Sequence, residues 1–171
     1  RPYTIADSPH PINRYGESKL LGEKFVCDLS DRYYLIRVSW VFGPGKVNFV
    51  KKVMEWSRTG QELRVVNDQV SSPTYTRDLA KATLDLVKTG MYGLYHITND
   101  GYCSRYEWAV HILDLLGWDG TVLPVSSEEF PTPARRPGFS ALDNFGSPEI
   151  LGYSLPEWKD ATRQFLDGEG T

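Results

Sequence analysis

The 171-residue sequence predicts an α/β fold with mainly parallel strand pairing. Short runs rich in β-branched and aromatic residues alternate with longer amphipathic stretches, which begin and end at helix-capping residues. Strands that are separated by helices favour parallel pairing, because each crossover returns the chain to the sheet in the same direction. We expect residues 1–171 to form a single unit, since this length suits one domain of ordinary size.

The expected strands are short apolar runs bounded by turn residues. In chain order they cover residues 34–38, 63–66, 93–97 and 121–125. The run over 34–38 is expected to be a buried strand, and the polar segment 68–74 is expected to be a loop. Residues 1–12 and 126–147 are rich in proline, so we expect irregular backbone in both.

Five helices are expected from periodic apolar positions and from capping residues. With their caps they cover residues 13–29, 47–59, 76–89, 104–117 and 156–166. Asn13 and Thr76 are expected as N-caps, because their side-chain oxygens can accept hydrogen bonds from free backbone N–H groups. Ser104 and Glu107 have the spacing of a capping box, and a short helical turn is expected to start at Ser147.

Composition and charge exclude several classes of protein. A net charge of -3 argues against a large basic face for nucleic acid, and no apolar run is long enough to span a membrane. Cys27 and Cys103 lie far apart without metal-binding spacing, which favours reduced thiols in a cytoplasmic protein over a disulfide. His10, His96 and His111 do not cluster in the sequence, so we expect structural or surface roles for them and no metal site.

The segment from Tyr15 to Lys19 has the clearest chemical pattern in the sequence. The two residues are four apart on an expected helix, so their side chains share one face. A free tyrosine has a pKa of about 10, and a nearby ammonium group lowers that pKa because it favours the phenolate. Such a tyrosine can donate a proton to a carbonyl oxygen as hydride reaches the carbon, or remove it in reverse. A solvated surface pair is the alternative that the spacing alone leaves open.

The residues around this pair extend the pattern. They resemble the active-site segment of the extended short-chain dehydrogenases/reductases, with matches at Asp7, Pro9, Pro11, Asn13, Tyr15, Gly16, Ser18, Lys19, Gly22 and Glu23. Four further segments match in order, at residues 37–43, 68–80, 136–144 and 155–158. In this order the segments are similar to the dTDP-4-dehydrorhamnose reductases, and they cover nearly the whole chain. The sequence departs from the pattern at Ser71 or Ser72, where the family often has glycine.

The resemblance implies a nicotinamide cofactor and assigns residues to it. Tyr15 is implied as the proton donor, and Lys19 as the group that lowers its pKa and binds a cofactor ribose hydroxyl. Ser39 follows the strand that lies beside the nicotinamide, so it is implied in cofactor binding together with Tyr15 and Lys19. The implied cofactor is NADPH, with NADH as the alternative, and the sequence gives no support for a Mg²⁺ ion.

Three further residues are implied in substrate binding. Trp40 lies where the family places an aromatic side chain against the sugar, and a core tryptophan is the alternative. Asn48 is either a ligand for the sugar or diphosphate or an ordinary helix cap. Arg136 is implied in a diphosphate contact, because a guanidinium matches phosphate oxygens in a two-point geometry, and a solvated loop arginine is the alternative.

The resemblance implies NADPH-dependent reduction of dTDP-4-dehydro-L-rhamnose to dTDP-L-rhamnose, a reaction that would feed polysaccharide synthesis. The implied partners are a dTDP-linked sugar and a second copy of the chain in a homodimer, with no nucleic acid and no membrane. Another nucleotide-sugar reductase or an epimerase is one alternative, and a non-catalytic regulatory or binding module of the same fold is another. The joint presence of Tyr15 and Lys19 favours an enzyme over such a module.

The family begins with a strand, a glycine-rich turn and a helix that hold the cofactor pyrophosphate, and the sequence has no such pattern. We therefore expect the C-terminal portion of a Rossmann-like fold, with the N-terminal cofactor-binding half missing. The helix that carries Tyr15 and Lys19 has apolar residues at Leu20, Leu21 and Phe25, and we expect this face to be partly uncovered. The isolated chain is expected to bind NADPH poorly and to have little activity.

Overall fold

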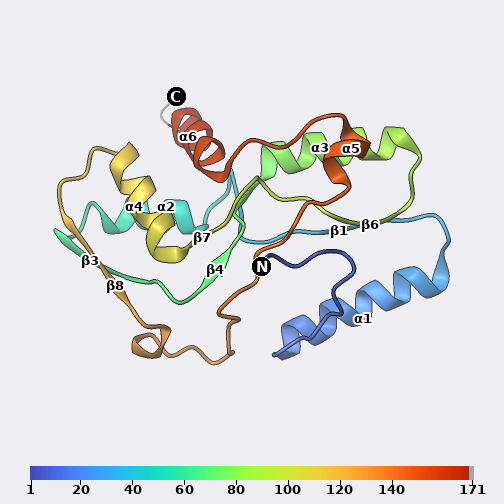
Figure 1. The fold of residues 1–171 in the computed structure, drawn as a ribbon. Coiled ribbons are helices and arrows are strands. Elements are labelled where there is room, and N and C mark those ends of the chain that lie inside the picture. The colour runs from blue at the N-terminus through green and yellow to red at the C-terminus, as the bar shows by residue number, and fades with distance from the viewer. Residues whose placement is uncertain (170–171) are drawn as a thin grey trace.

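The computed structural model describes residues 1–169 and confirms the predicted α/β architecture (Figure 1). Its strands are β1 (Tyr34–Arg37), β2 (Val41–Phe42), β3 (Glu62–Val66), β4 (Val70–Ser71), β5 (Thr74–Tyr75), β6 (Gly93–His96), β7 (Cys103–Ser104) and β8 (Thr121–Val125). The pairs β1–β6, β2–β5 and β3–β8 are parallel, and β4–β7 is antiparallel. The four predicted strands correspond to β1, β3, β6 and β8, so the mainly parallel pairing is confirmed.

The helices begin mostly at the caps that the sequence identifies. Their bounds are α1 (Arg14–Leu29), α2 (Phe49–Trp56), α3 (Thr76–Thr89), α4 (Arg105–Leu115), α5 (Ser147–Leu151) and α6 (Trp158–Glu169). Asn13 caps α1, and Ser104 and Glu107 form the predicted capping box of α4. The prediction that Thr76 caps α3 is wrong. Tyr75 holds the cap position without a side-chain bond, because β5 leads directly into the helix.

The β1–β6 pair lies between helices. In Figure 1, α1 lies on one side of the two strands, and α3 with α5 lies on the other side. Under α3, a cluster of buried apolar side chains covers the strands and consists of Ala82, Leu86, Tyr95, Ile97 and Leu155. Burial of apolar surface is the main favourable term in folding, so this cluster fixes β1 and β6 against α3.

A larger cluster joins α2, α4 and α6 around Trp108. Phe42 packs edge-on against the rings of Trp108 and Phe165, with ring centres 5.2 and 5.7 Å apart. Val50 and Val53 of α2 are fully buried in the same cluster. These contacts hold α4 and the chain after β2 in fixed positions, and both contribute residues to the site described below.

Two predictions about the first elements need correction. The run over 34–38 was expected to be buried, but every residue of β1 is partly exposed, because α1 contributes no buried side chain over it. The helix expected over 47–59 ends at Trp56, since the chain turns at residues 57–59 before β3. The expectation that α1 is partly uncovered is confirmed, since Leu21 is 52% exposed and Phe25 56% exposed.

The cysteines and the helix lengths are the remaining features of the fold. Cys27 is exposed, Cys103 is buried, and neither forms a disulfide. Burial raises the pKa of the Cys103 thiol far above its ordinary value, so this group stays protonated. None of the helices in residues 1–169 has the length and apolar character needed to cross a membrane.

Candidate active site

Helix α1 presents Tyr15 and Lys19 on one face, as their spacing predicts. The Lys19 Nζ atom lies 5.5 Å from the centre of the Tyr15 ring, and Tyr15 is 70% exposed. The Asn13 side chain holds the start of the helix from two sides. Its Oδ1 accepts from the Gly16 N–H at 2.8 Å, and its Nδ2 donates to the Arg135 carbonyl at 2.8 Å. The cap therefore fixes Tyr15 beside the loop that carries Arg136.

A two-point salt bridge attaches α1 to β1. Arg37 at the end of β1 donates from Nε and Nη2 to the two carboxylate oxygens of Glu23, at 2.8 and 2.6 Å. The planar guanidinium matches a carboxylate in this geometry, so the contact fixes orientation as well as adding energy. Because few apolar contacts hold α1, this bridge sets the position of Tyr15 relative to the strand ends.

The loop after β1 carries Ser39 and Trp40. Trp40 has a φ of 40°, a left-handed value that residues other than glycine rarely adopt and that clusters at functional sites. Thr74 holds this backbone, since its hydroxyl donates to the Ser39 carbonyl at 2.7 Å and its N–H donates to the Trp40 carbonyl at 3.3 Å. The Ser39 hydroxyl donates to the Ser72 carbonyl at 2.5 Å, so it is engaged within the protein.

A cleft of about 580 Å³ lies at the carboxyl ends of β1 and β6, with the N-terminal segment and the start of α1 on its walls. The structure brings three predicted site residues together in its walls, namely Tyr15, Trp40 and Arg136. Lys19 reaches Tyr15 from the next turn of α1, whereas Ser39 and Asn48 lie outside the walls. The clustering of residues from distant segments makes this cleft the candidate active site.

Asn48 has a structural role in the cap of α2. Its side chain accepts from the Lys51 N–H at 3.0 Å and donates to the Gly43 carbonyl at 2.9 Å. Both polar ends of the amide are therefore used within the protein. This geometry matches the helix-cap alternative that the sequence left open for Asn48.

Arg105, the first residue of α4, is a site residue that the sequence analysis missed. Its guanidinium carbon lies 3.7 Å from the centre of the Trp40 ring and 4.6 Å from that of Phe49. Trp40 stacks in turn on Trp108, with ring centres 5.8 Å apart and planes within 6°. Burial, and after it the positive charge of Arg136, lowers the pKa of Arg105 to about 10. This value is well above 7, so Arg105 places a cation in the cleft wall at neutral pH.

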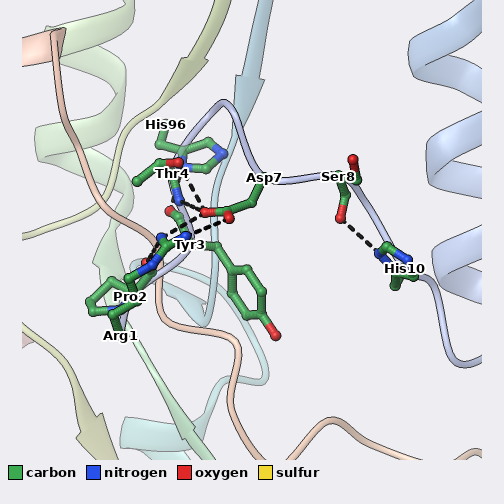
Figure 2. Close-up of polar contacts among 8 residues, drawn as sticks. All are labelled: Arg1, Pro2, Tyr3, Thr4, Asp7, Ser8, His10 and His96. Atoms are coloured by element: carbon green, nitrogen blue, oxygen red, sulfur yellow. Dashed lines mark hydrogen bonds and ion pairs between the residues drawn. The ribbon is translucent and has the colours of Figure 1, made fainter.

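The N-terminal segment is folded around Asp7 (Figure 2). The Asp7 carboxylate accepts hydrogen bonds from the Arg1 guanidinium at 2.7 and 2.8 Å. It also accepts from the N–H and the hydroxyl of Thr4, at 2.7 and 2.9 Å. Arg1 and these donors hold the pKa of Asp7 well below its usual range. The turn that results places Tyr3 and Thr4 along one wall of the cleft.

His96, the last residue of β6, is buried next to this segment, and Figure 2 shows it beside Tyr3 and Thr4. Its Nδ1 lies 3.1 Å from the carbonyl oxygens of both Tyr3 and Asp143. Both neighbours are acceptors, so Nδ1 carries the proton and Nε2 is an acceptor. Nε2 is buried without a hydrogen-bond partner in residues 1–169, and burial lowers the pKa of His96. A buried acceptor of this kind in a cleft wall is a group that a bound ligand can satisfy.

The other matching segments hold the site in place. Asn99 accepts from the Tyr75 N–H at 2.7 Å, and it donates to Asp78 at 2.7 Å and to the Pro156 carbonyl at 3.1 Å. The Asn144 side chain accepts from the Thr98 N–H at 2.9 Å and donates to the Thr98 carbonyl at 2.9 Å. Buried polar side chains that are satisfied in this way specify one arrangement of the loops they connect.

Asp68 fixes its own loop. It accepts hydrogen bonds from the Ser127 N–H at 2.9 Å and from the hydroxyls of Ser126 and Ser127, at 3.2 and 3.0 Å. The backbone donor at Ser127 contributes most to lowering the pKa of Asp68. The carboxylate thus joins the chain after β3 to the chain after β8.

His96 and Arg105 differ in how well the sequence could have placed them in the cleft wall. His96 ends a parallel strand, and the rule that ligands bind at the carboxyl ends of such strands applies to it as it does to Trp40. Arg105 follows the Ser104 cap of a helix, and its contact with Trp40 depends on packing between segments far apart in the chain. No local sequence pattern indicates that Arg105 lies in the cleft wall.

The arrangement combines a phenol next to an ammonium group with an aromatic ring and two guanidinium groups. A phenol so placed can give a proton to a carbonyl oxygen, and guanidinium groups bind anions such as phosphates. Within residues 1–169, no group of three or more His, Cys, Asp or Glu side chains is placed to hold a metal ion.

Comparison with known proteins identifies relatives along the whole chain. The chain is 40% identical over 166 residues to the spore coat polysaccharide biosynthesis protein SpsK of Bacillus subtilis, covering 97% of this chain and 58% of that protein. It is 41% identical to a dTDP-4-dehydrorhamnose reductase structure from Clostridium acetobutylicum, with a TM-score of 0.94, covering 100% of this chain and 61% of that one. A dTDP-4-dehydrorhamnose reductase from Bacillus anthracis, solved in complex with NADP, is 38% identical, with a TM-score of 0.91 and coverage of 98% and 59%.

These likenesses confirm the predicted fold class, a mixed α/β Rossmann-like fold. The chain spans between 58% and 61% of the length of these three relatives. The sequence profile of the RmlD substrate binding domain matches residues 1–170. The match covers every segment that forms the cleft, from Tyr3 in the N-terminal turn to Leu142. The chain therefore belongs to the RmlD substrate binding domain family.

Proposed function

We propose that this chain carries the proton-donating and substrate-binding part of a nucleotide-sugar reductase. Its reaction is the NADPH-dependent reduction of dTDP-4-dehydro-L-rhamnose to dTDP-L-rhamnose. The proposal depends on one observation. Tyr15 lies in one cleft with Trp40 and Arg136, and the Lys19 ammonium lies 5.5 Å from the centre of the Tyr15 ring. The names of the two solved relatives, at 41% and 38% identity, support the choice of substrate.

The residues present fit a nicotinamide cofactor. The cleft lies at the carboxyl ends of parallel strands, where α/β folds bind such ligands, and His96 Nε2 offers a buried acceptor without a partner in residues 1–169. Lys19 and Tyr15 would hold the ribose. Because the Ser39 hydroxyl is bound to Ser72, a contact from Ser39 to the cofactor would come from its backbone. NADPH, when bound, supplies the hydride, and the B. anthracis relative was solved with NADP.

Tyr15 supplies the proton in this proposal. Its phenolic hydroxyl donates to the C4 carbonyl oxygen of the sugar as the carbon is reduced, so no free alkoxide forms. The phenolate that remains is stabilised by the Lys19 ammonium, which lies 5.5 Å from the ring centre. The 70% exposure of Tyr15 leaves its hydroxyl open to a substrate in the cleft.

Substrate binding is proposed for Trp40 and Arg136 in the same cleft. Trp40 would present its ring to the sugar, and Arg136 would contact the diphosphate in a two-point geometry. The nucleotide lies away from the reacting carbon, so its contacts supply remote binding energy that positions the sugar. The homodimer stays a prediction from the family resemblance, and the cytoplasmic location stays a prediction from the spacing of the two cysteines.

The test follows NADPH oxidation by the complete product of the gene that encodes this chain, with dTDP-4-dehydro-L-rhamnose as substrate. We expect turnover that depends on this sugar, faster with NADPH than with NADH. The 171-residue chain alone, assayed in parallel, is expected to bind NADPH poorly and to turn over little. Turnover only with other nucleotide-linked keto sugars would indicate a related reductase. A folded product that binds no cofactor would favour the regulatory or binding module.

A further inference from the structure

Two arginines of the cleft lack an anionic partner in the described part of the chain. Arg37, which also lines the cleft, is neutralised by Glu23. The guanidinium groups of Arg105 and Arg136 make neither a salt bridge nor a hydrogen bond with any side chain of residues 1–169. The cleft wall therefore has an excess of positive charge at these two positions.

The environment of Arg105 makes this excess costly. Arg105 is partly exposed, and a charge that is largely removed from water without a partner is unfavourable unless a counter-charge compensates for it. The two guanidinium groups also repel each other, and burial together with this repulsion lowers the pKa of Arg105 to about 10. An anion between them would remove both penalties at once, because it restores a partner to each guanidinium.

The aromatic rings hold Arg105 in a defined orientation. Its guanidinium lies 3.7 Å from the centre of the Trp40 ring and 4.6 Å from that of Phe49, a cation–π arrangement. Such stacking leaves the edge of the planar guanidinium, where its N–H donors lie, free to bind a ligand. Trp40 is itself fixed by its stack on Trp108. The donors of Arg105 are thus positioned before any ligand arrives, which lowers the entropy cost of binding.

We propose that Arg105 determines substrate specificity, by forming with Arg136 a subsite for the diphosphate of a nucleotide-linked sugar. Two guanidinium groups suit a diphosphate, which carries more than one negative charge and several acceptor oxygens. A single carboxylate carries one negative charge and would neutralise only half of the positive charge of the pair. This inference rests on the proposed function. It adds Arg105, which lies next to the ring of Trp40, as the residue that selects for the diphosphate.

The experiment measures binding to the complete gene product by calorimetry, with dTDP, thymidine and inorganic pyrophosphate as probes. Arg105→Met removes the charge and keeps an apolar stem, whereas Arg105→Lys keeps the charge and removes the planar fork. Arg163→Met is the matched control, because Arg163 is an exposed arginine on α6 that pairs with Asp160, outside the cleft. Near-ultraviolet circular dichroism of each variant checks that the packing around Trp40 is kept.

We expect Arg105→Met to weaken dTDP binding by roughly 10- to 100-fold, the effect of losing a charged hydrogen-bonding group. Thymidine binding should not change, and the salt dependence of dTDP binding should become shallower. Arg105→Lys should fall between wild type and Arg105→Met, and Arg163→Met should match wild type. A packing role alone would weaken thymidine and dTDP equally.

Other outcomes separate this inference from the proposed function. Unchanged dTDP affinity in Arg105→Met, with wild type active on the keto sugar, would overturn the subsite and leave the reductase proposal intact. Pyrophosphate binding that depends on Arg105 in a protein without reductase activity would support the subsite and contradict the reductase. Absence of dTDP and pyrophosphate binding in folded wild-type protein would overturn the subsite.

Discussion

At the scale of single residues, Trp40 connects the backbone of the cleft to its chemistry. A left-handed φ of 40° costs a non-glycine residue about 1–3 kcal/mol, so the surroundings must hold it. Thr74 does so through the backbone, and Arg105 and Trp108 do so through the ring. These contacts fix the orientation of the ring before a ligand binds, which supports its proposed contact with the sugar.

His96 gives a prediction for the pH dependence of stability. Burial, and to a lesser extent the charge of Arg37, lowers its pKa in the folded state below the ordinary value of 6.5, while its contacts to Asp143 and Tyr3 oppose this shift. The unfolded chain therefore binds the proton more readily, and stability should be full above about pH 6.5 and fall as the pH decreases below it. We expect the melting temperature of the chain to decrease between pH 7.5 and 5.

The variant His96→Gln tests this assignment, because glutamine has no titrating group. Its melting temperature should change less over the same pH range than that of wild type. The pKa of Asp7 is held below its ordinary 3.8, so Asp7 changes the pH dependence of stability only below about pH 5 and does not affect this comparison. Equal pH dependence in both proteins would show that His96 is not the responsible group.

At the scale of elements, polar contacts rather than apolar burial position α1, and the start of α4 is set by a polar cap although its body is buried in the core. α1 has no buried residue and is held by the Asn13 cap and by the Glu23–Arg37 bridge. α4 begins with the capping box of Ser104 and Glu107, directly before Arg105. Caps fix where a helix starts, so they also fix the residues of its first turn.

The capping box of α4 gives a second prediction. Ser104→Ala removes the hydroxyl that accepts from the Glu107 N–H at 3.1 Å, and we expect a loss of about 1 kcal/mol in the free energy of unfolding. Urea denaturation followed by circular dichroism measures the change. Thr132→Ala, in an exposed loop, should cost much less. Equal losses in the two variants would mean that the box does not stabilise α4.

The exposed face of α1 gives a third prediction. Leu21, Phe25 and Leu29 follow one another at four-residue spacing, and they are 52%, 56% and 82% exposed. An apolar stripe of this kind promotes association, so the 171-residue chain should associate at high concentration in sedimentation velocity experiments. Phe25→Lys should reduce the association. Leu84→Lys, on α3 and 64% exposed, should not, and equal effects of the two changes would contradict the role of the α1 stripe.

At the scale of the whole molecule, local signals predicted the elements, whereas long-range packing determined the site. Asn13 and the Ser104 box could be identified because a cap depends on residues three apart. The two-residue strands β2, β4, β5 and β7 could not, because such pairs depend on distant partners and not on an apolar run. The position of Arg105 in the cleft wall could not be predicted for the same reason, because its partner Trp40 lies far away in the chain.

In the candidate site, too, local signals predicted some features and long-range packing determined others. Tyr15 and Lys19 are neighbours within one helix, so their spacing sufficed to predict their contact. Their assembly with Trp40 and Arg136 in one cleft required the family resemblance, because three separate segments contribute. The resemblance gave Ser39 and Asn48 ligand roles, yet the side chains of both are bound within the protein. Sequence motifs thus include residues that build the site as well as residues that face it.

The most direct test of the central claim is the turnover of Tyr15→Phe in the complete gene product, with NADPH and dTDP-4-dehydro-L-rhamnose. The change removes one hydroxyl from an exposed side chain, so folding should be retained, and saturating NADPH compensates for the lost contact to the ribose. Tyr92→Phe, an exposed tyrosine outside the cleft, is the control and should match wild type. The account predicts a fall in kcat of about 100-fold or more for Tyr15→Phe, the range expected for loss of a general acid. Turnover at the wild-type rate would contradict it.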